Sequence, residues 1–182
     1  AKIELIDEGL LRRLIDEDLI TDHRLRSLNP NRPVLRGTAQ NPDVFFQARE
    51  AANGFYDAVP AVVSSAMRKI GDATGRRYDL FEYSGSPEAD TVMVIMGSGS
   101  GAAHEAVRRL ENDGHKVGMV QVRLYRPFAA STLVERIPAS ARRVVVLDRT
   151  KEPGAVGEPL YQDVVAALAE ELQRDHVVGQ EV

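Results

Sequence analysis

The sequence contains no cysteine, few aromatic residues and no long apolar run, and these absences exclude several classes of protein. Without cysteine, the chain cannot form a disulfide, supply a thiolate nucleophile, or hold a zinc ion or an iron–sulfur cluster through sulfur ligands. No stretch approaches the roughly eighteen apolar residues of a membrane span, and the first residues show no signal-peptide pattern. The net charge of −4 gives no electrostatic basis for binding nucleic acid. We therefore expect a cytoplasmic protein that binds neither nucleic acid nor membrane.

The second half of the chain alternates between apolar strands and amphipathic helices. The expected strands are 91–96, 116–124 and 142–148, and the expected helices are 101–113, 129–137 and 159–174. Apolar residues fill the strands, which indicates burial on both faces, as in a parallel sheet. The alternation predicts an α/β fold with an open, three-layer, mostly parallel sheet and right-handed crossovers.

The first half predicts a helical and irregular extension before this α/β layer. Residues 1–28 carry a helical apolar period, whereas residues 29–55 are rich in proline, glycine and asparagine. We interpret 29–55 as an irregular crossing between two domains, because a loop of that length is unusual inside one compact domain. Val44, Phe45 and Phe46 need burial, so this crossing is expected to be held in place.

A helix is expected over residues 57–71, where apolar side chains follow the 3.6-residue period. Asp57 is suited to cap its start, Pro60 to lie in its first turn and Gly71 to end it. Residues 76–90 are then expected to be extended. The chain thus divides into 1–55, 56–87 and 88–182.

A glycine-rich turn follows the first strand. Gly97, Gly99 and Ala102 match the loose pattern G-x-G-x-x-A, which lets a backbone approach a pyrophosphate at a helix N-terminus. A dinucleotide site also needs an acidic residue at the end of the second strand, and Arg123 stands there instead. A structural corner is therefore the favoured interpretation, and a nucleotide- or CoA-binding turn remains the alternative.

The loop after the third strand is the other dense group of charges. Asp148, Arg149 and Lys151 lie beyond the carboxyl end of a strand, where α/β sheets usually place function. Arg149 and Lys151 could contact an anion or a partner. The favoured alternative is an internal network of ion pairs, in which Asp148 pairs with Arg123 or Arg126.

Metal and nucleophile motifs are not indicated. The histidines are His23, His104, His115 and His176, and no two of them have the H-x-x-x-H spacing of a metal site. No serine stands in G-x-S-x-G, so the nucleophile elbow of hydrolases is not predicted. We assign no catalytic residue and no metal ligand to this chain.

Four longer stretches carry a family resemblance. They are RGTAQNPDVFFQAREAAN (36–53), YDLFEYSGSPEAD (78–90), VRLYRPF (122–128) and VLDRTKEPGAVGEPLYQDVVAAL (146–168). In this order they resemble the middle of the pyruvate:ferredoxin (flavodoxin) oxidoreductases. The resemblance implies that residues from about 88 onward form a transketolase C-terminal-like domain. It also implies that residues 1–55 are the tail of a preceding pyrimidine-binding domain with the crossing from it.

The resemblance further implies a much longer enzyme that uses thiamine diphosphate, Mg²⁺ and [4Fe-4S] clusters. Such an enzyme converts pyruvate and CoA to acetyl-CoA and CO₂, passes electrons to ferredoxin or flavodoxin, and is expected to be a homodimer. Those cofactors, CoA and the electron acceptor are expected to bind outside this segment, whose partners are the other domains of the enzyme.

The resemblance suggests only weak candidates for contact with the active site. They are Arg36, Gly37, Thr38, Gln40 and Asn41, and a structural tether is an equal alternative for this stretch. The function implied for the segment is structural, within an oxidoreductase. The competing hypotheses are a free-standing nucleotide- or CoA-binding module built on 97–102 and an interaction domain without a ligand.

Overall fold

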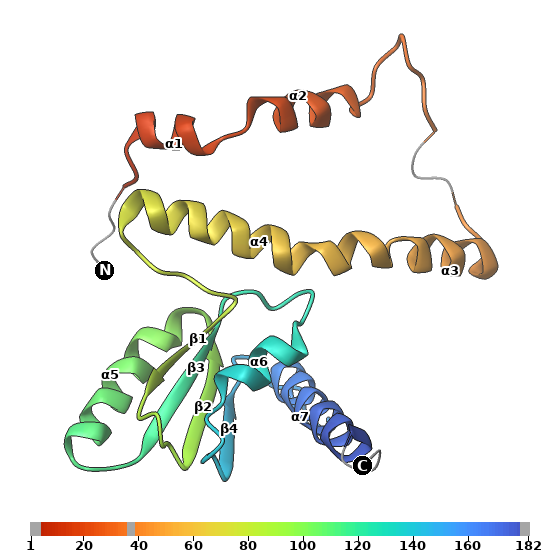
Figure 1. The fold of residues 1–182 in the computed structure, drawn as a ribbon. Helices are drawn as coiled ribbons and strands as arrows, with labels where there is room; N and C mark the ends of the chain where they lie inside the picture. Colours follow the sequence, from red (N-terminus) through yellow and green to blue (C-terminus); the bar gives the residue numbers. More distant parts are fainter. Residues whose placement is uncertain (1–4, 36–38, 179–182) are drawn as a thin grey trace.

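The computed structural model describes residues 5–35 and 39–178. They form an α/β unit preceded by a helical segment (Figure 1). Among these residues, no helix combines the length and apolar character needed to cross a bilayer. The predicted α/β class with an N-terminal helical and irregular extension is confirmed.

A four-stranded sheet forms the centre of the α/β unit, in the order β1-β3-β2-β4. The strands are β1 (Phe81–Gly85), β2 (Thr91–Met96), β3 (Val117–Val122) and β4 (Arg143–Leu147). The β2–β3 and β2–β4 pairs are parallel, and β1 pairs antiparallel with β3. The predicted open, mostly parallel sheet is confirmed, and the stretch expected to be extended supplies the antiparallel edge strand β1.

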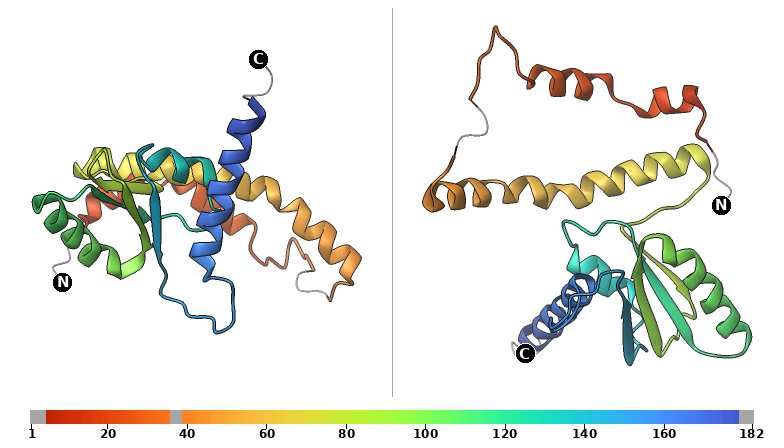
Figure 2. Two further views of the ribbon diagram at one scale, coloured as in Figure 1. Left: turned by 90° about the horizontal axis from the view of Figure 1, so that it is seen from below. Right: turned by 180° about the vertical axis from the view of Figure 1, so that it is seen from behind.

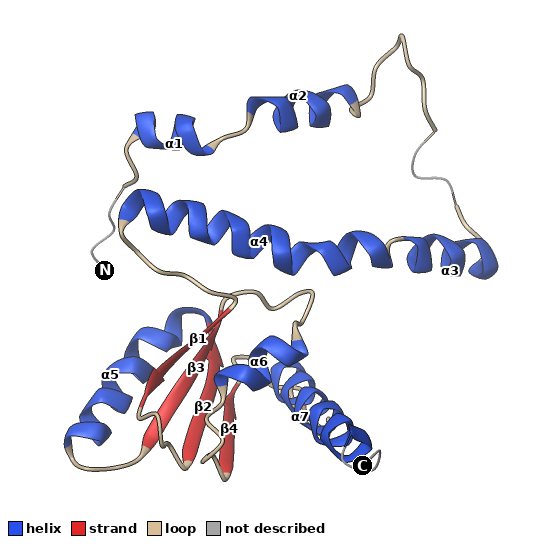
Figure 3. Cartoon of the chain, in the orientation of Figure 1, coloured by secondary structure: helices blue, strands red, loops and turns tan. Residues whose placement is uncertain are grey.

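Helices cover both faces of the sheet and complete the three layers (Figure 3). On one face, α5 (Ser100–Asn112) packs Ala103 and Val107 against Ile95 and Met119. On the other, α6 (Ala130–Arg136) and α7 (Pro159–Val178) complete the larger core. Its fully buried members are Phe81, Ala89, Val92, Val94, Val120, Leu133, Leu160 and Val164. This burial follows from the period-2 pattern of strands and the 3.6-residue pattern of helices.

Burial on both faces holds for β2 and β3 but is wrong for β4. This strand lies at the edge of the sheet, and Val145 and Leu147 are 38% and 43% exposed on one of its faces. The cause is the position of α5, whose main contacts are with β3 and β1. Val144 and Val146, on the opposite face, pack against the larger core.

The helical segment contains four helices where the sequence predicted a helical region, an irregular crossing and one helix. They are α1 (Glu8–Leu14), α2 (Glu17–Leu25), α3 (Pro42–Ala51) and α4 (Asn53–Thr74). The expectation that 29–55 is irregular is therefore wrong for its second half. Pro42 occupies the first turn of α3, where the missing N–H costs nothing, so the proline starts a helix here.

Helix α4 is longer at both ends than the 57–71 expected. Asp57 and Pro60 lie inside it, so neither has the predicted place at its start. Gly71 also lies inside the helix, which ends at Gly75 with a positive φ of 72°. Figures 1 and 2 show α4 between the α/β unit and α1–α2, and Val63 and Met67 attach α4 to the larger core.

The apolar residues of α3 are not buried, contrary to expectation. Val44, Phe45 and Phe46 are 48%, 54% and 64% exposed. The reason is visible in Figure 2, where α3 projects away from the sheet, and its main contact is with α4. Burial of these side chains therefore requires surfaces outside the described residues.

We predict that Gly118→Ala destabilises the α/β unit, because the ring of Tyr83 on β1 lies directly over Gly118 on β3. A Cβ atom on Gly118 would fall 2.1 Å from the Tyr83 hydroxyl oxygen and 2.6 Å from Cζ. The ring cannot retreat without losing the 2.5 Å hydrogen bond that Tyr83 donates to the Ser86 carbonyl. Overpacking of this kind costs about 1–3 kcal/mol of unfolding free energy, measurable by denaturant titration.

Gly101→Ala is the matched control, since a Cβ there meets no atom within 4 Å and lies in helix α5. That change is expected to stabilise the fold by up to about 1 kcal/mol. Equal effects of the two substitutions would contradict the packing argument.

Candidate functional site

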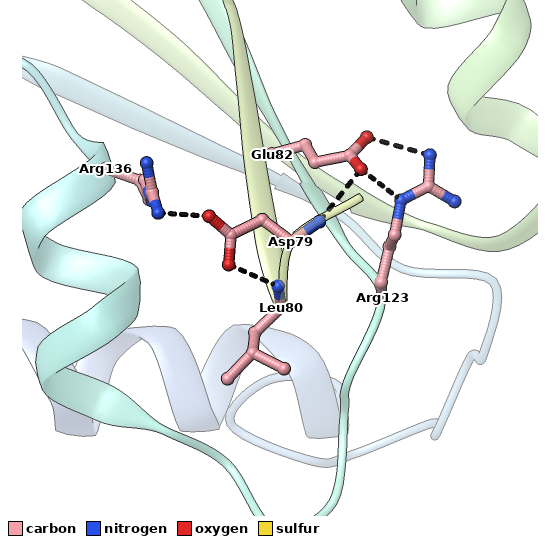
Figure 4. Close-up of polar contacts among 5 residues, drawn as sticks. All are labelled: Asp79, Leu80, Glu82, Arg123 and Arg136. Atoms are coloured by element: carbon pink, nitrogen blue, oxygen red, sulfur yellow. Dashed lines mark hydrogen bonds and ion pairs between the residues drawn. The ribbon is translucent and has the colours of Figure 1, made fainter. Parts of the chain in front are cut away.

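The junction between α4 and β1 carries a connected set of polar contacts (Figure 4). Glu82 and Arg123 form a two-point ion pair, with Nε–Oε1 and Nη2–Oε2 distances of 2.7 and 2.8 Å. The backbone N–H of Asp79 also donates to Glu82 at 3.2 Å, and the Asp79 carboxylate pairs with Arg136 of α6. These contacts join three elements to the residues that precede β1.

The backbone positions these side chains. Arg123 directly follows β3, and its N–H donates to the Leu80 carbonyl at 2.9 Å, so the register of β3 against β1 continues into the junction. The Arg123 guanidinium also lies 4.9 Å from the centre of the Tyr78 ring. Since Arg123 already has a carboxylate and an aromatic ring as partners, it is not a free cation for a phosphate.

The predicted glycine turn and the predicted cation Arg149 lie together, because β2 and β4 are neighbours. Gly97 has a φ of 79°, which favours glycine, and Ser100 donates through its hydroxyl to the Gly97 carbonyl. Arg149 Nη1 donates to Ser98 Oγ at 3.0 Å, which places the guanidinium over the turn. The turn is thus closed by contacts within the chain, as the structural interpretation expects.

The charged loop contains the ion-pair network that was the favoured interpretation. Lys151 Nζ lies 2.9 Å from Glu158 Oε1, which also accepts the Glu152 N–H at 3.0 Å. The bond from Lys151, and then that from the Glu152 N–H, lower the pKa of Glu158 below its ordinary value. Asp148 accepts backbone N–H groups of Leu160 and Thr150, at 2.8 and 3.2 Å. It therefore caps the start of α7.

The predicted pairing of Asp148 with Arg123 or Arg126 is wrong. Strand β2 lies between β3 and β4, so the ends of the latter two strands are not adjacent. Arg126 instead pairs with Asp163 of α7 at 2.8 Å and stacks 4.0 Å from the centre of the Tyr125 ring. Burial, followed by a hydrogen bond with Asp163, raises the pKa of Tyr125. Sequence reasoning missed Asp163, whose helix position carries no motif.

The residues proposed to lie near an active site fall in and beside an undescribed stretch. Arg36, Gly37 and Thr38 lie outside the described residues, whereas Gln40 and Asn41 are exposed at the start of α3. Within 5–35 and 39–178, no three His, Cys, Asp or Glu side chains are grouped so that they could hold a metal ion. Without cysteine, the chain also has no thiolate to ligate an iron–sulfur cluster.

Two family models match the chain. Residues 89–180 match pyruvate:ferredoxin oxidoreductase core domain II. Residues 1–68 match pyruvate flavodoxin/ferredoxin oxidoreductase, thiamine diphosphate-binding. Residues 69–88, which contain the end of α4 and strand β1, lie between the two matches.

Individual relatives carry the same names. A pyruvate-flavodoxin oxidoreductase of Rhodospirillum rubrum is 56% identical over 92% of this chain and 14% of its own length. A pyruvate:ferredoxin oxidoreductase of Moorella thermoacetica is 49% identical over 98% of this chain and 15% of its own length. The chain thus spans about one seventh of these relatives.

Among solved structures, a 2-oxoglutarate:ferredoxin oxidoreductase from Magnetococcus marinus with 2-oxoglutarate, coenzyme A and succinyl-CoA bound covers 64% of this chain and 18% of its own length. It is 18% identical with a TM-score of 0.37, too low to support an argument.

We predict that the Glu82–Arg123 pair contributes a measurable coupling energy, because the ion pair is bidentate and both side chains are only about 30% exposed. A double-mutant cycle with Glu82→Gln and Arg123→Gln, followed by denaturant unfolding, should give about 1 kcal/mol. The matched control is Glu88–Lys116, a one-point pair with side chains 71% and 61% exposed, which should couple less. A coupling energy no larger than that of the control would show that the Glu82–Arg123 pair does not stabilise the junction.

A second prediction concerns the charged loop and pH. Lys151→Met should raise the pKa of Glu158 toward its ordinary value, as measured by NMR titration of the carboxyl group. Since the folded-state pKa is lowered, the carboxylate stabilises the loop above the unfolded-state pKa, and this is lost as the pH falls through the folded-state pKa. Lys116→Met should raise the pKa of Glu88 and leave Glu158 unchanged. A Glu158 pKa that is unchanged by Lys151→Met would contradict the proposed ion-pair network.

Proposed function

The chain belongs to the pyruvate:ferredoxin (flavodoxin) oxidoreductase family, and we propose that it is a structural segment of a longer enzyme of this family. In this role the segment braces the cofactor-binding domains and takes part in subunit contacts. The whole enzyme converts pyruvate and CoA to acetyl-CoA, CO₂, a proton and two electrons, which pass to ferredoxin or flavodoxin. The dimeric state of the enzyme and its location in the cytoplasm are part of the same proposal.

The observation that supports this role is the exposed apolar surface of the helical segment. Large apolar side chains are more than 40% exposed along α1–α4, in contrast to the closed core of the α/β unit. They are Leu11, Ile15, Leu19, Leu25, Val44, Phe45, Phe46, Phe55, Tyr56 and Val62. Exposed apolar surface of this extent is typical of an interface. We infer that the segment packs against other domains of its own enzyme.

A groove between α1–α2 and α4 adds to this surface. It encloses about 460 Å³ and is lined mainly by apolar side chains, among them Leu14, Leu19, Val62 and Ile70. Side chains of another helix can pack into a groove of this kind between two helices. The helical segment therefore has the character of one part of a larger packed layer.

The cofactor chemistry is assigned to other parts of the enzyme. Thiamine diphosphate would supply decarboxylation and iron–sulfur clusters would carry electrons, but this chain has no cysteine to hold a cluster. No step is therefore assigned to its side chains. Residues 36–41 near the active site remain a prediction, as does the division into 1–55, 56–87 and 88–182.

A second candidate function rests on the meeting of Arg149 with the glycine turn. A free-standing nucleotide- or CoA-binding module would use the turn and Arg149 as an anion site. Such a module should be stabilised by its ligand, by about 2.7 kcal/mol at a hundred times the dissociation constant. The structural segment should show no shift in its unfolding temperature with CoA, NADH or NADPH.

We predict that Phe46→Ser and Phe55→Ser affect the full-length protein but hardly affect this chain alone. The two rings are 64% and 80% exposed here, so the unfolding free energy of the chain should change by no more than about 0.5 kcal/mol. In the full-length protein, each loss of a buried ring should cost about 2 kcal/mol or more, with a lower unfolding temperature. CoA-dependent reduction of ferredoxin or flavodoxin by pyruvate should fall as well.

Gln47→Ser, an exposed polar position on α3, is the control and should leave both proteins unchanged. If Phe46→Ser and Phe55→Ser change the stability of the full-length protein as little as that of this chain, the bracing role is contradicted. A full-length protein without pyruvate-dependent electron transfer would contradict the enzyme assignment itself.

A further inference from the structure

Helix α4 belongs to two parts of the molecule at once. Its residues 53–68 fall within the match to the thiamine diphosphate-binding family model, whereas the match to core domain II begins only at residue 89. Yet Val63 and Met67 of this helix pack against the larger core of the α/β unit. A movement of the α/β unit relative to α4 therefore has to occur in the connection that follows the helix.

The connection leaves α4 through a tight turn that two glycines make possible. Gly75 ends the helix with a φ of 72°, and its N–H donates to the Gly71 carbonyl at 2.8 Å. The Arg76 carbonyl then folds back over the helix, so that a Cβ atom on Gly71 would lie 2.5 Å from its oxygen. Glycine destabilises a helix interior relative to alanine. The close approach of Arg76 accounts for a glycine at position 71.

The other end of the connection is held by the α/β unit (Figure 4). The Asp79 carboxylate pairs with α6, and the Leu80 carbonyl accepts the N–H of Arg123 at 2.9 Å. Only residues 76–78 lie between these contacts and the turn that ends α4, and the Tyr78 ring lies against the Arg123 guanidinium. Because hinges are loop residues that can change φ and ψ freely, this short and restrained stretch is not built as one.

We propose that the α4–β1 junction is a rigid coupling, in which the close approach of Arg76 to Gly71 sets one fixed orientation of the α/β unit on α4. In the full-length protein, the α/β unit and the part that contains α4 then move as one body. This inference rests on the proposed function to the extent that the chain is a segment of a longer enzyme. It goes beyond the bracing role because it states that the brace has no hinge and names the residue that sets its angle.

The test is a distance measurement between two spin labels in the full-length protein. Asp57→p-acetylphenylalanine on α4 and Asn112→p-acetylphenylalanine on α5 replace exposed residues and accept a ketone-reactive nitroxide. Dilution with unlabelled copies restricts the dipolar signal to pairs within one chain. Labels at Asn112 and Glu135, both in the α/β unit, define the width that a rigid pair gives. The Asp57–Asn112 pair should give a single distance distribution of the same width.

Gly71→Ala tests the residue that sets the orientation. Its Cβ atom has to displace the Arg76 carbonyl, so the Asp57–Asn112 distance should move by more than about 2 Å or the distribution should split. The Asn112–Glu135 distribution should stay as it is. Gly54→Ala in the same helix is the matched control, since a Cβ atom there meets nothing within 4 Å, and it should change neither distribution.

Three results would overturn the proposal. A broad or two-peaked Asp57–Asn112 distribution in the unsubstituted protein would show a hinge, whatever Gly71→Ala does to folding. An unchanged distribution in Gly71→Ala would show that this glycine does not set the orientation. A change in the Asn112–Glu135 distribution as well would show that Gly71 serves the fold of the α/β unit instead. None of these results bears on the proposed function, which the pyruvate-dependent electron-transfer assay decides separately.

Discussion

Burial of Phe81 fixes the edge of the sheet and the point where the chain enters the α/β unit. This residue begins β1, is fully buried and meets the Phe128 ring edge-on with centroids 5.5 Å apart. It pairs with Val122 at the end of β3, so the same position sets the antiparallel register and the point where the chain enters the sheet. The ion pairs of Asp79 and Glu82 lie on either side of it. The polar junction is therefore fixed by an apolar anchor, and the charges refine a geometry that burial has already set.

The molecule consequently has two halves with different degrees of closure. Around Phe81 the α/β unit buries its apolar residues between helical layers, and only the β4 side stays open. Before the junction, α1–α4 expose most of their large apolar side chains. Since hydrophobic burial is the main stabilising contribution to folding, the first half gains little stability within this chain. In the proposed role, other parts of the longer enzyme cover these helices.

The sequence predicted local structure well where apolar runs are long, and poorly where pairing is non-local. Every strand and helix expected after residue 90 is present within a few residues of its bounds. The sequence does not predict helix α3, because the pattern around Pro42 indicates a turn although proline fits the first turn of a helix equally well. The Asp148 pairing failed because the order β3-β2-β4 is not encoded in any local pattern. Asp163 was missed for the same reason, since its partner Arg126 is contributed by a distant loop.

The end of the sheet that usually binds ligands in open α/β proteins is used differently here. After β4, Arg149 bonds to Ser98, which follows β2, and Lys151 pairs with Glu158. After β3, Arg123 pairs with Glu82. An incoming anion would have to break these contacts before it could be held. The charges therefore stabilise loops and the junction, and the surfaces left unsatisfied are apolar ones, along α1–α4 and beside β4. Cations paired within the chain at this end of the sheet, together with exposed apolar faces, fit the proposed role of a segment that packs against other parts of a longer protein.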